Sequence, residues 1–514
     1  MSHRIGLLLA DAGMESMPMR YEDYLGLDQF MRKLIATSIP LVLSDNYEHF
    51  MAKLPGKPFG AQQVIVRRQI GGFTVASGYW KWLEFLCHRL THAEVELVAD
   101  FFSGGHNDHE RPFDKAYWHD RVVDQCGGYL PIRVEYPGEG AVFTGVPFPI
   151  AQIYGERPAI WVNEPMYIQI GHLCHVATVA AQFRQILGGA ERFIDVAFRS
   201  LQNKEASDDY LLAMLVGGGI ISTSNDLGAM INGRPFKPSG TTGHCYYQQF
   251  DTVEEALRAL LTSSLGPQST VLLDGVSHQR GFEVLRALIR EGLPAPFAVR
   301  PDSGDTIKLG FHDLAALQED GTAINVVFED GYEPVNALAA ERTRRASAID
   351  RKRAIYGAGS AFLAPRSALE TAYKACFFHD GSIQQPTGSV ETMKICFDDT
   401  AKQSIPGMID WFLEDNTGLF MIGCAGEAAP PGYRRVNRVL YDGLTRPGDP
   451  YVNPHYSPSN LTGCKAIERG QRLCHTLLGK LEGAVTETIE PNRAGVAMTR
   501  ALQEKRRHII RSAR

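Results

Sequence analysis

Residues able to bind a phosphate and a sugar follow one short apolar run. The segment Val299-Arg300-Pro301-Asp302-Ser303-Gly304-Asp305 comes directly after Pro296–Val299, a run that is typical of a buried strand. An arginine can bind two phosphate oxygens at once in a bidentate contact, and a carboxylate can accept hydrogen bonds from vicinal sugar hydroxyls. Gly304 lets the backbone approach a ligand closely. This pattern indicates a phosphate-and-ribose site, and an ordinary Asx or Ser turn is the alternative.

Two further groups of residues lie upstream. Asp195-Val196-Ala197-Phe198-Arg199 ends a predicted strand, and three glycines at 217–219 lead to Ser222-Thr223-Ser224-Asn225. The third stretch, Ser239-Gly240-Thr241-Thr242-Gly243-His244, crowds small residues around one histidine. An imidazole near an arginine can hold a pyrophosphate or accept a phosphoryl group, although a histidine standing alone is more often structural.

Between about residues 269 and 363 the chain repeats an apolar run, a polar turn and an amphipathic stretch. The predicted strands are Thr270–Leu273, Pro296–Val299, Ile324–Phe328 and Ala354–Tyr356. The predicted helices are Gly281–Arg290, His312–Leu317 and Glu333–Arg342. This alternation predicts a parallel (β/α) barrel that carries the turn after every strand on one rim. The residues in those turns are Asp274, Arg300, Asp302, Asp330, Gly331, Gly357, Gly359 and Ser360.

The rest of the chain is expected to support this barrel. The stretch Trp161–Leu187 predicts one long buried helix, and residues 41–148 predict an antiparallel or α+β lobe. Strand-like runs return after about residue 397, and we expect them to pack with the N-terminal lobe. The fold class predicted is therefore α/β, an irregular (β/α) barrel with a second β-rich α+β lobe built from both chain ends. The expected division is residues 1–155, 156–375 and 376–514, and the basic stretch Leu502–Arg514 is expected to be a surface helix.

Composition limits the classes of partner. The 514 residues are 44% hydrophobic and 21% charged, and no run approaches the roughly 18 consecutive apolar residues of a membrane span. A formal charge of −6 offers no general attraction for nucleic acid, so small molecules are the expected partners. The nine cysteines are scattered without a C-x-x-C pair, and Ile5–Ala10 is too short for a signal peptide, so we expect free thiols and a cytoplasmic protein.

Seven short motifs in order resemble one family. They are D-x-x-x-R, G-G-x-x-x-T-S-N, G-T-x-x-H, L-L-D, R-P-D-S-G-D, E-D-G and Y-G-A-G, spread from about Tyr136 to Lys374. Their order and spacing resemble the nicotinate/nicotinamide phosphoribosyltransferase family. The likeness is thinner over Leu41–Phe50 and poor over roughly the first 40 and last 110 residues.

The resemblance implies a type II phosphoribosyltransferase that works as a head-to-tail homodimer with shared active sites. It implies that Arg199, His244 and Arg300 contact the pyrophosphate of phosphoribosyl pyrophosphate (PRPP), and that Asp302 and Asp330 hold the ribose hydroxyls. It further implies that Gly331, Gly359 and Ser360 receive the 5′-phosphate, and that Tyr47, Arg366 and Lys374 reach across the dimer interface, with Tyr47 stacking on the pyridine. His244 matches the histidine that ATP phosphorylates in this family. His244, Asp302 and Arg300 are the expected catalytic residues, and Asp274 is an expected substrate-binding residue.

The implied reaction is displacement at the anomeric carbon, with no covalent nucleophile. The protein must position the substrates and neutralise the leaving pyrophosphate, which suits Arg199, Arg300 and Mg²⁺. The carboxylates of the rim could bind Mg²⁺ directly or through water, and no residue is assigned as a dedicated metal ligand.

Two positions and one stretch depart from the family pattern. Val196 stands where a phenylalanine is usual, Glu329 replaces a glycine near the phosphate, and residues 381–394 lack a lysine-rich loop. Ser224 stands where the nicotinamide-using branch has an aspartate. Because an aspartate there would repel the carboxylate of nicotinate, serine favours nicotinate, with nicotinamide as the alternative substrate.

Two other classes of function stay open. The cluster His106-Asn107-Asp108-His109-Glu110 with His119 suggests a (β/α) barrel metal hydrolase, although it is not H-E-x-x-H on a helix. A catalytically idle binding or regulatory relative is the other class, since Val196 and Glu329 depart from the pattern.

Overall fold

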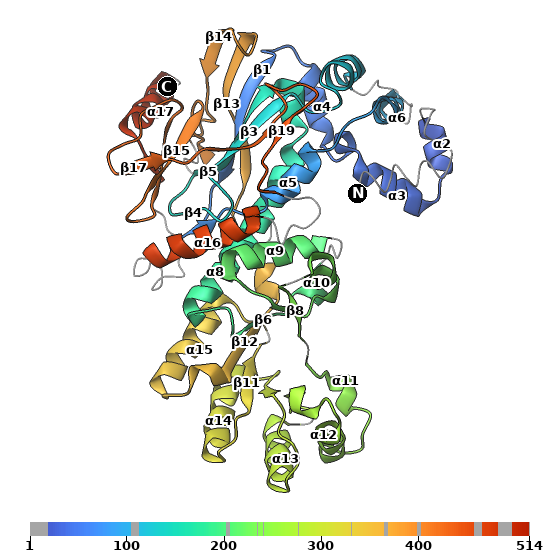
Figure 1. The fold of residues 1–514 in the computed structure, drawn as a ribbon, viewed down its shortest axis with the longest axis vertical. Helices are drawn as coiled ribbons and strands as arrows, with labels where there is room; N and C mark the ends of the chain where they lie inside the picture. The colour runs from blue at the N-terminus through green and yellow to red at the C-terminus, as the bar shows by residue number, and fades with distance from the viewer. Residues whose placement is uncertain are drawn as a thin grey trace.

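The computed structural model describes residues 19–103, 113–201, 206–233, 235–239, 241–275, 277–329, 331–363, 369–397, 402–456, 465–481 and 496–512. The molecule is elongated, with two large sheets one above the other (Figure 1). The upper part of Figure 1 holds the antiparallel strands, and the lower part holds the helices and strands of the predicted repeats.

The helices cover both parts. Those of the N-terminal region are α2 (Tyr21–Gly26), α3 (Gln29–Ser38), α4 (Asn46–Lys53), α5 (Tyr79–Leu86), α6 (His92–Ser103) and the π-helix η2 (Tyr117–Gln125). Those of the middle are α7 (Arg157–Trp161), α8 (Glu164–Leu187), α9 (Ser207–Gly218), α10 (Asp226–Asn232), α11 (His244–Tyr247), α12 (Val253–Thr262), α13 (His278–Arg290), α14 (Thr306–Glu319) and α15 (Pro334–Ala346). The last two are α16 (Lys465–Lys480) and α17 (Arg500–Ser512).

The lower sheet is parallel throughout. Its strand order is β8-β7-β6-β12-β11-β10-β9, and every neighbouring pair runs in the same direction. The bounds are β6 (Phe193–Asp195), β7 (Ser222–Thr223), β8 (Lys237–Pro238), β9 (Thr270–Leu272), β10 (Ala298–Arg300), β11 (Asn325–Phe328) and β12 (Ala354–Ala358). Since β8 and β9 are the two ends of the sheet within the described residues, it forms a curled half-barrel, and closure into a complete ring stays a prediction.

The predicted repeats appear in this sheet. The observed strand boundaries differ from the predicted ones by one or a few residues at most of the strand ends. The apolar runs form strands that are buried on both faces, because the helices between them pack against the sheet. The helices α13 and α14 each begin at a capping side chain. Ser277 accepts the N–H of Arg280 at the start of α13, and Asp305 accepts the N–H of Lys308 at 3.0 Å at the start of α14. Asp305, the second carboxylate of the R-P-D-S-G-D motif, is therefore a helix cap.

The upper sheet is antiparallel and joins distant parts of the chain. Its order is β14-β13-β1-β5-β3-β18-β19, so that β13 pairs with β1 and β18 pairs with β3. The bounds are β1 (Phe59–Val66), β3 (Ile132–Tyr136), β5 (Phe148–Glu156), β13 (Ala372–Gly381), β14 (Pro386–Glu391), β18 (Arg438–Asp442) and β19 (Tyr451–Val452). A smaller sheet, β17-β15-β16-β20, and the pair β2-β4 complete the strands. Their bounds are β2 (Thr74–Val75), β4 (Val142–Phe143), β15 (Ile409–Glu414), β16 (Phe420–Cys424), β17 (Tyr433–Arg435) and β20 (Ala497–Met498).

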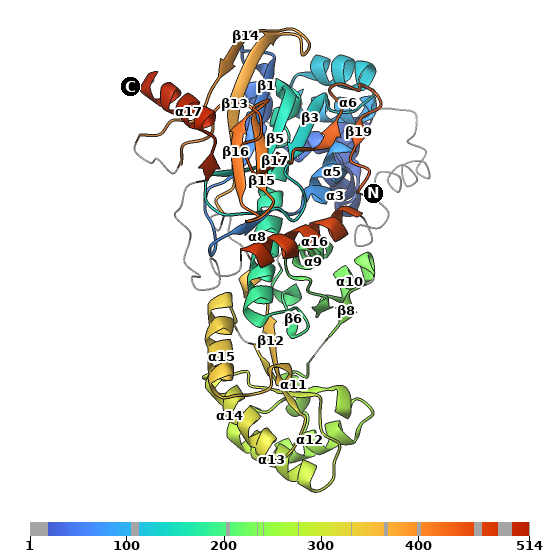
Figure 2. The ribbon, with the colours of Figure 1, turned by 60° about the vertical axis from the view of Figure 1, so that its left-hand side comes forward.

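The buried helix α8 links the two parts. It packs against α5 and β2 above and against α9 and α15 below, and Figure 2 shows it passing between the two sheets. The prediction of one helix over Trp161–Leu187 is wrong at its start, because α7 ends at Trp161 and α8 begins at Glu164. A proline lies in the first turn of α8, where its missing N–H costs no helical hydrogen bond.

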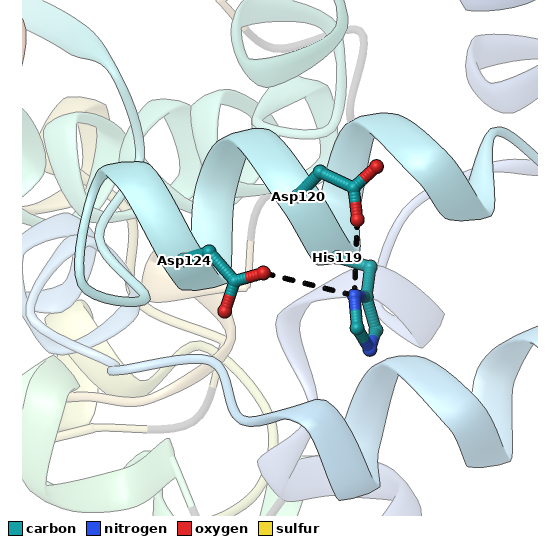
Figure 3. Close-up of side chains that lie close together, drawn as sticks. All are labelled: His119, Asp120 and Asp124. Carbon is teal, nitrogen blue, oxygen red and sulfur yellow. Dashed lines mark hydrogen bonds and ion pairs between the residues drawn. The ribbon is translucent and has the colours of Figure 1, made fainter.

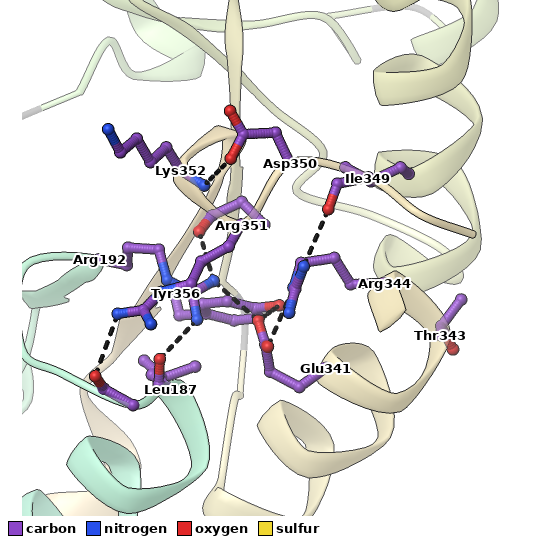
Figure 4. Close-up of polar contacts among 12 residues, drawn as sticks. Leu187, Arg192, Glu341, Thr343, Arg344, Ile349, Asp350, Arg351, Lys352 and Tyr356 are labelled. Atoms are coloured by element: carbon purple, nitrogen blue, oxygen red, sulfur yellow. Dashed lines mark hydrogen bonds and ion pairs between the residues drawn. The ribbon is translucent and has the colours of Figure 1, made fainter. Parts of the chain in front are cut away.

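A buried polar network fixes α15 to the amino end of the parallel sheet (Figure 4). Arg192, just before β6, lies 2.7 Å from Glu341, and both side chains are about 2–3% exposed. Tyr356 donates to Glu341 at 2.9 Å, and Arg344 donates to its other oxygen at 3.0 Å. Burial alone would raise the pKa of Glu341, but the two arginines and the tyrosine hold that pKa below its usual value. This network lies at the opposite edge of the sheet from the predicted rim, so its role is structural.

Candidate active site at the carboxyl edge of the parallel sheet

The predicted site residues follow the carboxyl ends of neighbouring strands. Because all seven strands run the same way, the turns after them meet at one edge of the sheet. Ser224 follows β7, Arg199 lies shortly after β6, and Gly359 with Ser360 follows β12. Continuing across the sheet, Glu329 follows β11, Arg300 ends β10, and Asp274 follows β9.

His244 lies against two of the predicted carboxylates. Its Nε2 atom is 3.1 Å from Asp274 Oδ1, and its Nδ1 atom is 3.8 Å from Asp302 Oδ2. Ser303 donates its hydroxyl to the other oxygen of Asp274 at 2.7 Å. The histidine side chain is 43% exposed whereas that of Asp274 is 6% exposed, so a buried carboxylate orients an accessible imidazole. The three side chains together could also hold a cation.

Arg300 is surrounded by polar partners on the same rim. Its guanidinium pairs with the carboxylate of Glu329, contacts the hydroxyl of Thr241, and lies 3.4 Å from Asp302. Its Nε atom is buried without a partner among the described residues. The Arg300 and Glu329 side chains are 12% and 9% exposed. A guanidinium oriented in this way can meet an anion entering from the open side of the rim.

The sequence singled out Glu329 only as a departure from the family pattern. In the structure it is the principal counter-ion of Arg300, since β10 and β11 are neighbours in the sheet. Glu329 also lies against β12, because a Cβ atom on Gly357 would come within 2.9 Å of its Oε2 atom. Thr241 was quoted within a motif without a role, and no sequence signal indicated its contact with Arg300.

At the other end of the rim, Asp195 organises the turn that carries Ser224. The Thr223 hydroxyl donates to Asp195 Oδ2 at 2.6 Å, and the Ala197 N–H donates to Oδ1 at 2.8 Å. The backbone N–H of Ser224 donates to the Asp195 carbonyl at 2.8 Å. Burial raises the pKa of the Asp195 carboxyl group to about 6, although these two hydrogen bonds favour its charged form. Ser224 is half-buried at the rim, and Arg199 is exposed.

Glycines allow the backbone to come close at two positions. A Cβ atom on Gly359 would lie 2.8 Å from the carbonyl oxygen of Val196, so β12 and the turn after β6 can approach only because residue 359 is glycine. Gly331 has a φ of +65°, a conformation that other residues rarely adopt. Ser360 begins the short 3₁₀-helix η7 (Ser360–Phe362) directly after Gly359. The predicted site residues Asp330 and Arg366 lie outside the described residues.

Tyr47 and Lys374 lie apart from the rim, in the upper part of the molecule. Tyr47 is on α4 and Lys374 is on β13, whereas α11 and β11 belong to the lower part (Figure 1). The Tyr47 hydroxyl contacts Glu164 at the start of α8. Glu164 and Lys374 line a cavity of about 540 Å³, with Arg67, Tyr167, Glu370 and Tyr373 among its other walls. Within one chain, therefore, these residues do not join His244 and Arg300.

Comparisons with known proteins agree on one fold. No protein-family model matches the chain. A curated nicotinamide phosphoribosyltransferase from Xanthomonas campestris pv. campestris (strain 8004) is 24% identical over 439 residues, which cover 76% of this chain and 91% of that protein. The crystal structure of human nicotinic acid phosphoribosyltransferase superposes with a TM-score of 0.62 at 17% identity, over 91% of this chain and 99% of that one. The nicotinate-nucleotide pyrophosphorylase from Pyrococcus furiosus superposes with a TM-score of 0.57 at 14% identity, over 89% of this chain and 97% of that one.

The likenesses to solved structures define the fold class of this chain. The chain is a mixed α/β protein with a curled parallel half-barrel sheet and a nicotinate phosphoribosyltransferase-like fold. The sequence relationship to a nicotinamide phosphoribosyltransferase spans three quarters of the chain at 24% identity, and it agrees with this fold. Among the described helices, none is long and apolar enough to cross a membrane.

Proposed function

We propose that this protein is a phosphoribosyltransferase of NAD salvage that joins nicotinate to PRPP, giving nicotinate mononucleotide and pyrophosphate. The observation that carries the proposal is the convergence of His244, Asp274, Asp302 and Arg300 on one rim. These residues are up to 58 positions apart in sequence, and they supply the anion-binding and hydroxyl-binding groups that PRPP requires. The sequence likeness to a nicotinamide phosphoribosyltransferase supports the same type of reaction.

Each part of PRPP has proposed partners on the rim. Arg199, His244 and Arg300 bind the pyrophosphate, and Asp302 with Asp330 holds the ribose hydroxyls. The 5′-phosphate lies at Gly331, Gly359 and Ser360, where the backbone is open to a close approach. In the displacement, the bond from the anomeric carbon to pyrophosphate breaks as the pyridine nitrogen attacks. Positive charge on Arg300 stabilises the departing pyrophosphate, and the fixed rim holds the reactants in line.

Mg²⁺ and ATP belong to the proposal as cofactor and coupled substrate. The carboxylates of Asp274 and Asp302 fit a magnesium–pyrophosphate complex, because Mg²⁺ prefers oxygen ligands and keeps several waters. When bound, Mg²⁺ neutralises part of the pyrophosphate charge. His244 is the proposed acceptor of a phosphoryl group from ATP. Its Nε2 atom lies against Asp274, and a carboxylate on one ring nitrogen makes the other a better nucleophile.

We propose that the active form is a homodimer in the cytoplasm. Tyr47 and Lys374 lie far from the rim of their own chain, which is what residues that complete a partner's site would require. In the dimer, Tyr47 stacks on the pyridine of the neighbouring site, and Arg366 with Lys374 adds positive charge there. The cavity lined by Glu164 and Lys374 lies beside this surface.

Ser224 decides the choice of pyridine in this proposal. It follows β7 at the rim without adding a negative charge, so the carboxylate of nicotinate meets a hydroxyl donor rather than an anion. An aspartate at this position would cost on the order of 1 kcal/mol or more for nicotinate when partly desolvated. Nicotinamide is the second candidate substrate, because the Xanthomonas relative is named a nicotinamide phosphoribosyltransferase.

Steady-state kinetics with both pyridines test the proposal. We expect wild-type kcat/KM to favour nicotinate, and Ser224→Asp to shift the ratio toward nicotinamide by roughly tenfold, since 1.4 kcal/mol is a factor of ten. Ser382→Asp, in the exposed turn between β13 and β14, is the matched control and should leave the ratio unchanged. A wild-type preference for nicotinamide rejects nicotinate as the substrate. An absence of PRPP turnover with either pyridine identifies an idle relative instead.

A further inference from the structure

Two histidines on different helices share one aspartate in the upper part of the molecule. His92 is the first residue of α6, and His119 lies in the π-helix η2. Their rings are 4.0 Å apart between centroids. His92 Nε2 lies 2.9 Å from Asp124 Oδ1, and His119 Nδ1 lies 3.9 Å from Asp124 Oδ2. Asp120 approaches the same Nδ1 atom at 3.1 Å (Figure 3).

The π-helix is the reason that His119 and Asp124 lie on one face. In an α-helix, residues five apart are separated by about 140° around the axis, at 3.6 residues per turn. A π-helix bonds residue i to residue i+5, so side chains five apart come nearly into line. Figure 3 shows the carboxylates of Asp120 and Asp124 both turned toward the His119 ring. This helix type is rare and is frequently found at functional sites.

Three of the separations are close to those of a tetrahedral metal site. With bonds of about 2.1 Å to nitrogen and oxygen, tetrahedral ligands lie about 3.4 Å apart. The measured separations are 2.9 Å for His92–Asp124, 3.1 Å for His119–Asp120 and 3.9 Å for His119–Asp124. Ligand atoms of His119, Asp120 and Asp124 all lie within 4.8 Å of one another, and His92, which contacts Asp124, would turn toward them to complete the site.

We propose that His92, His119, Asp120 and Asp124 form a binding site for a zinc-class divalent cation that links α6 to the π-helix. Two imidazoles and two carboxylates suit Zn²⁺, Co²⁺ or Ni²⁺, whereas Mg²⁺ takes oxygen ligands. The metal would be coordinated by a ring nitrogen of each histidine and by one oxygen of each carboxylate.

The surrounding charges favour a cation. Glu96 lies 3.9 Å from His119 Nε2 and is paired with Lys115 at 2.7 Å. Arg121, next in sequence to Asp120, is engaged with Glu156 at 2.6 Å and so does not compensate the aspartates. The His92 and His119 side chains are 47% and 32% exposed, so a metal ion can enter from solvent. The site is separate from His244, and it carries no assigned role in the reaction.

The test measures Zn²⁺ binding to the full-length protein, freed of any affinity tag and of bound metal. His244→Ala serves as the background, because His244, Asp274 and Asp302 are the other group that could hold a metal among the described residues. Titration against a chromogenic chelator should give one Zn²⁺ per chain in that background. His92→Gln and His119→Gln should each weaken Zn²⁺ binding by at least about tenfold.

Two controls separate this site from general binding. His312→Gln changes an exposed histidine that has one carboxylate nearby, Asp313 at 3.5 Å, and it should leave Zn²⁺ affinity unchanged. Co²⁺ should give the visible absorption of tetrahedral coordination by nitrogen and oxygen in the His244→Ala protein, and this band should vanish when His92 and His119 are both replaced by glutamine. Excess Mg²⁺ should not displace the Zn²⁺.

The proposal is overturned if the variant with both histidines replaced binds Zn²⁺ as tightly as its background, or if the background binds none. Circular dichroism and PRPP turnover in the His92→Gln/His119→Gln protein with His244 intact establish that it is folded. If that variant is unfolded, Asp120→Asn and Asp124→Asn decide the matter, since unchanged Zn²⁺ affinity in both also overturns the proposal.

Discussion

Arg300 is held by a buried counter-ion on the same rim where it is proposed to bind pyrophosphate, so its loss should have two separable effects. The first is on stability. In Arg300→Ala the Glu329 carboxylate, 9% exposed, loses its guanidinium partner. Removing one member of a buried ion pair costs about 3–5 kcal/mol, and the slight exposure of both groups places the expected loss at the lower end, near 3 kcal/mol.

The second effect is on catalysis. A hydrogen bond to a charged group contributes about 1.5–3 kcal/mol, so losing the contact to pyrophosphate should lower kcat/KM for PRPP roughly tenfold to a hundredfold. The double variant Arg300→Ala/Glu329→Gln separates the two effects. Its neutral amide is buried at much lower cost than a lone carboxylate, so most of the unfolding free energy should return while activity does not.

Urea unfolding followed by circular dichroism gives the free energies, and steady-state kinetics give kcat/KM. Arg258→Ala, which removes an exposed pair with Glu254 and Glu291, is the control, and its loss of unfolding free energy should be small beside that of Arg300→Ala. If the double variant regains turnover together with stability, Arg300 acts only as the partner of Glu329, and its proposed contact with pyrophosphate is refuted. If Arg300→Ala alone loses less than about 1 kcal/mol of unfolding free energy, the contribution of the buried ion pair to stability is refuted.

Two further outcomes follow from buried or oriented ionisable groups. His244→Ala should lower kcat/KM for PRPP at least about tenfold and abolish labelling of the protein by γ-phosphate-labelled ATP, and retained labelling would show that another residue accepts the phosphoryl group. Burial raises the pKa of Glu139 to about 7 from the usual 4.5, despite hydrogen bonds from Gly78 and Tyr456. Between those pH values the folded protein keeps a proton that the unfolded chain has lost, so wild-type stability falls as pH rises, by about 1.4 kcal/mol per pH unit at most. Glu139→Gln cannot ionise at this position. From pH 4.5 to pH 7, urea unfolding should show the free energy of unfolding of this variant rising by up to about 3 kcal/mol relative to that of wild type. An equal difference between the two proteins at both pH values would refute the raised pKa.

Much of the parallel sheet could be predicted because its signals are local. The run Ile324–Phe328 is mostly apolar and rich in β-branched residues, and the structure has β11 at Asn325–Phe328. Helix starts were less predictable, since His312–Leu317 covers less than half of α14, whose start is set by the capping side chain of Asp305. The same aspartate shows a limit of motif reasoning. A carboxylate in R-P-D-S-G-D can face a ligand or cap a helix, and only the backbone geometry distinguishes the two.

Contacts between side chains from different strands could not be predicted. Glu329 pairs with Arg300 because β11 lies beside β10, and Thr241 reaches the same guanidinium from the loop before α11. The pair of His92 with His119 depends on a π-helix, which no sequence pattern signalled. In each case the partner is chosen by packing, which no short window of sequence contains.

The amino-acid order alone established that apolar runs alternate with polar turns, and that an arginine, a histidine and several carboxylates stand in those turns, because hydrophobic periodicity and turn chemistry act over a few neighbouring residues. Three-dimensional packing decided which turns meet. In the sheet β6 lies beside β12, so Asp195 and Ala358 become neighbours across more than 160 positions, while Tyr47 and Lys374 are carried to the other part of the molecule. Strand order is a property of the whole packed core, and it is this order that turns scattered polar residues into one rim.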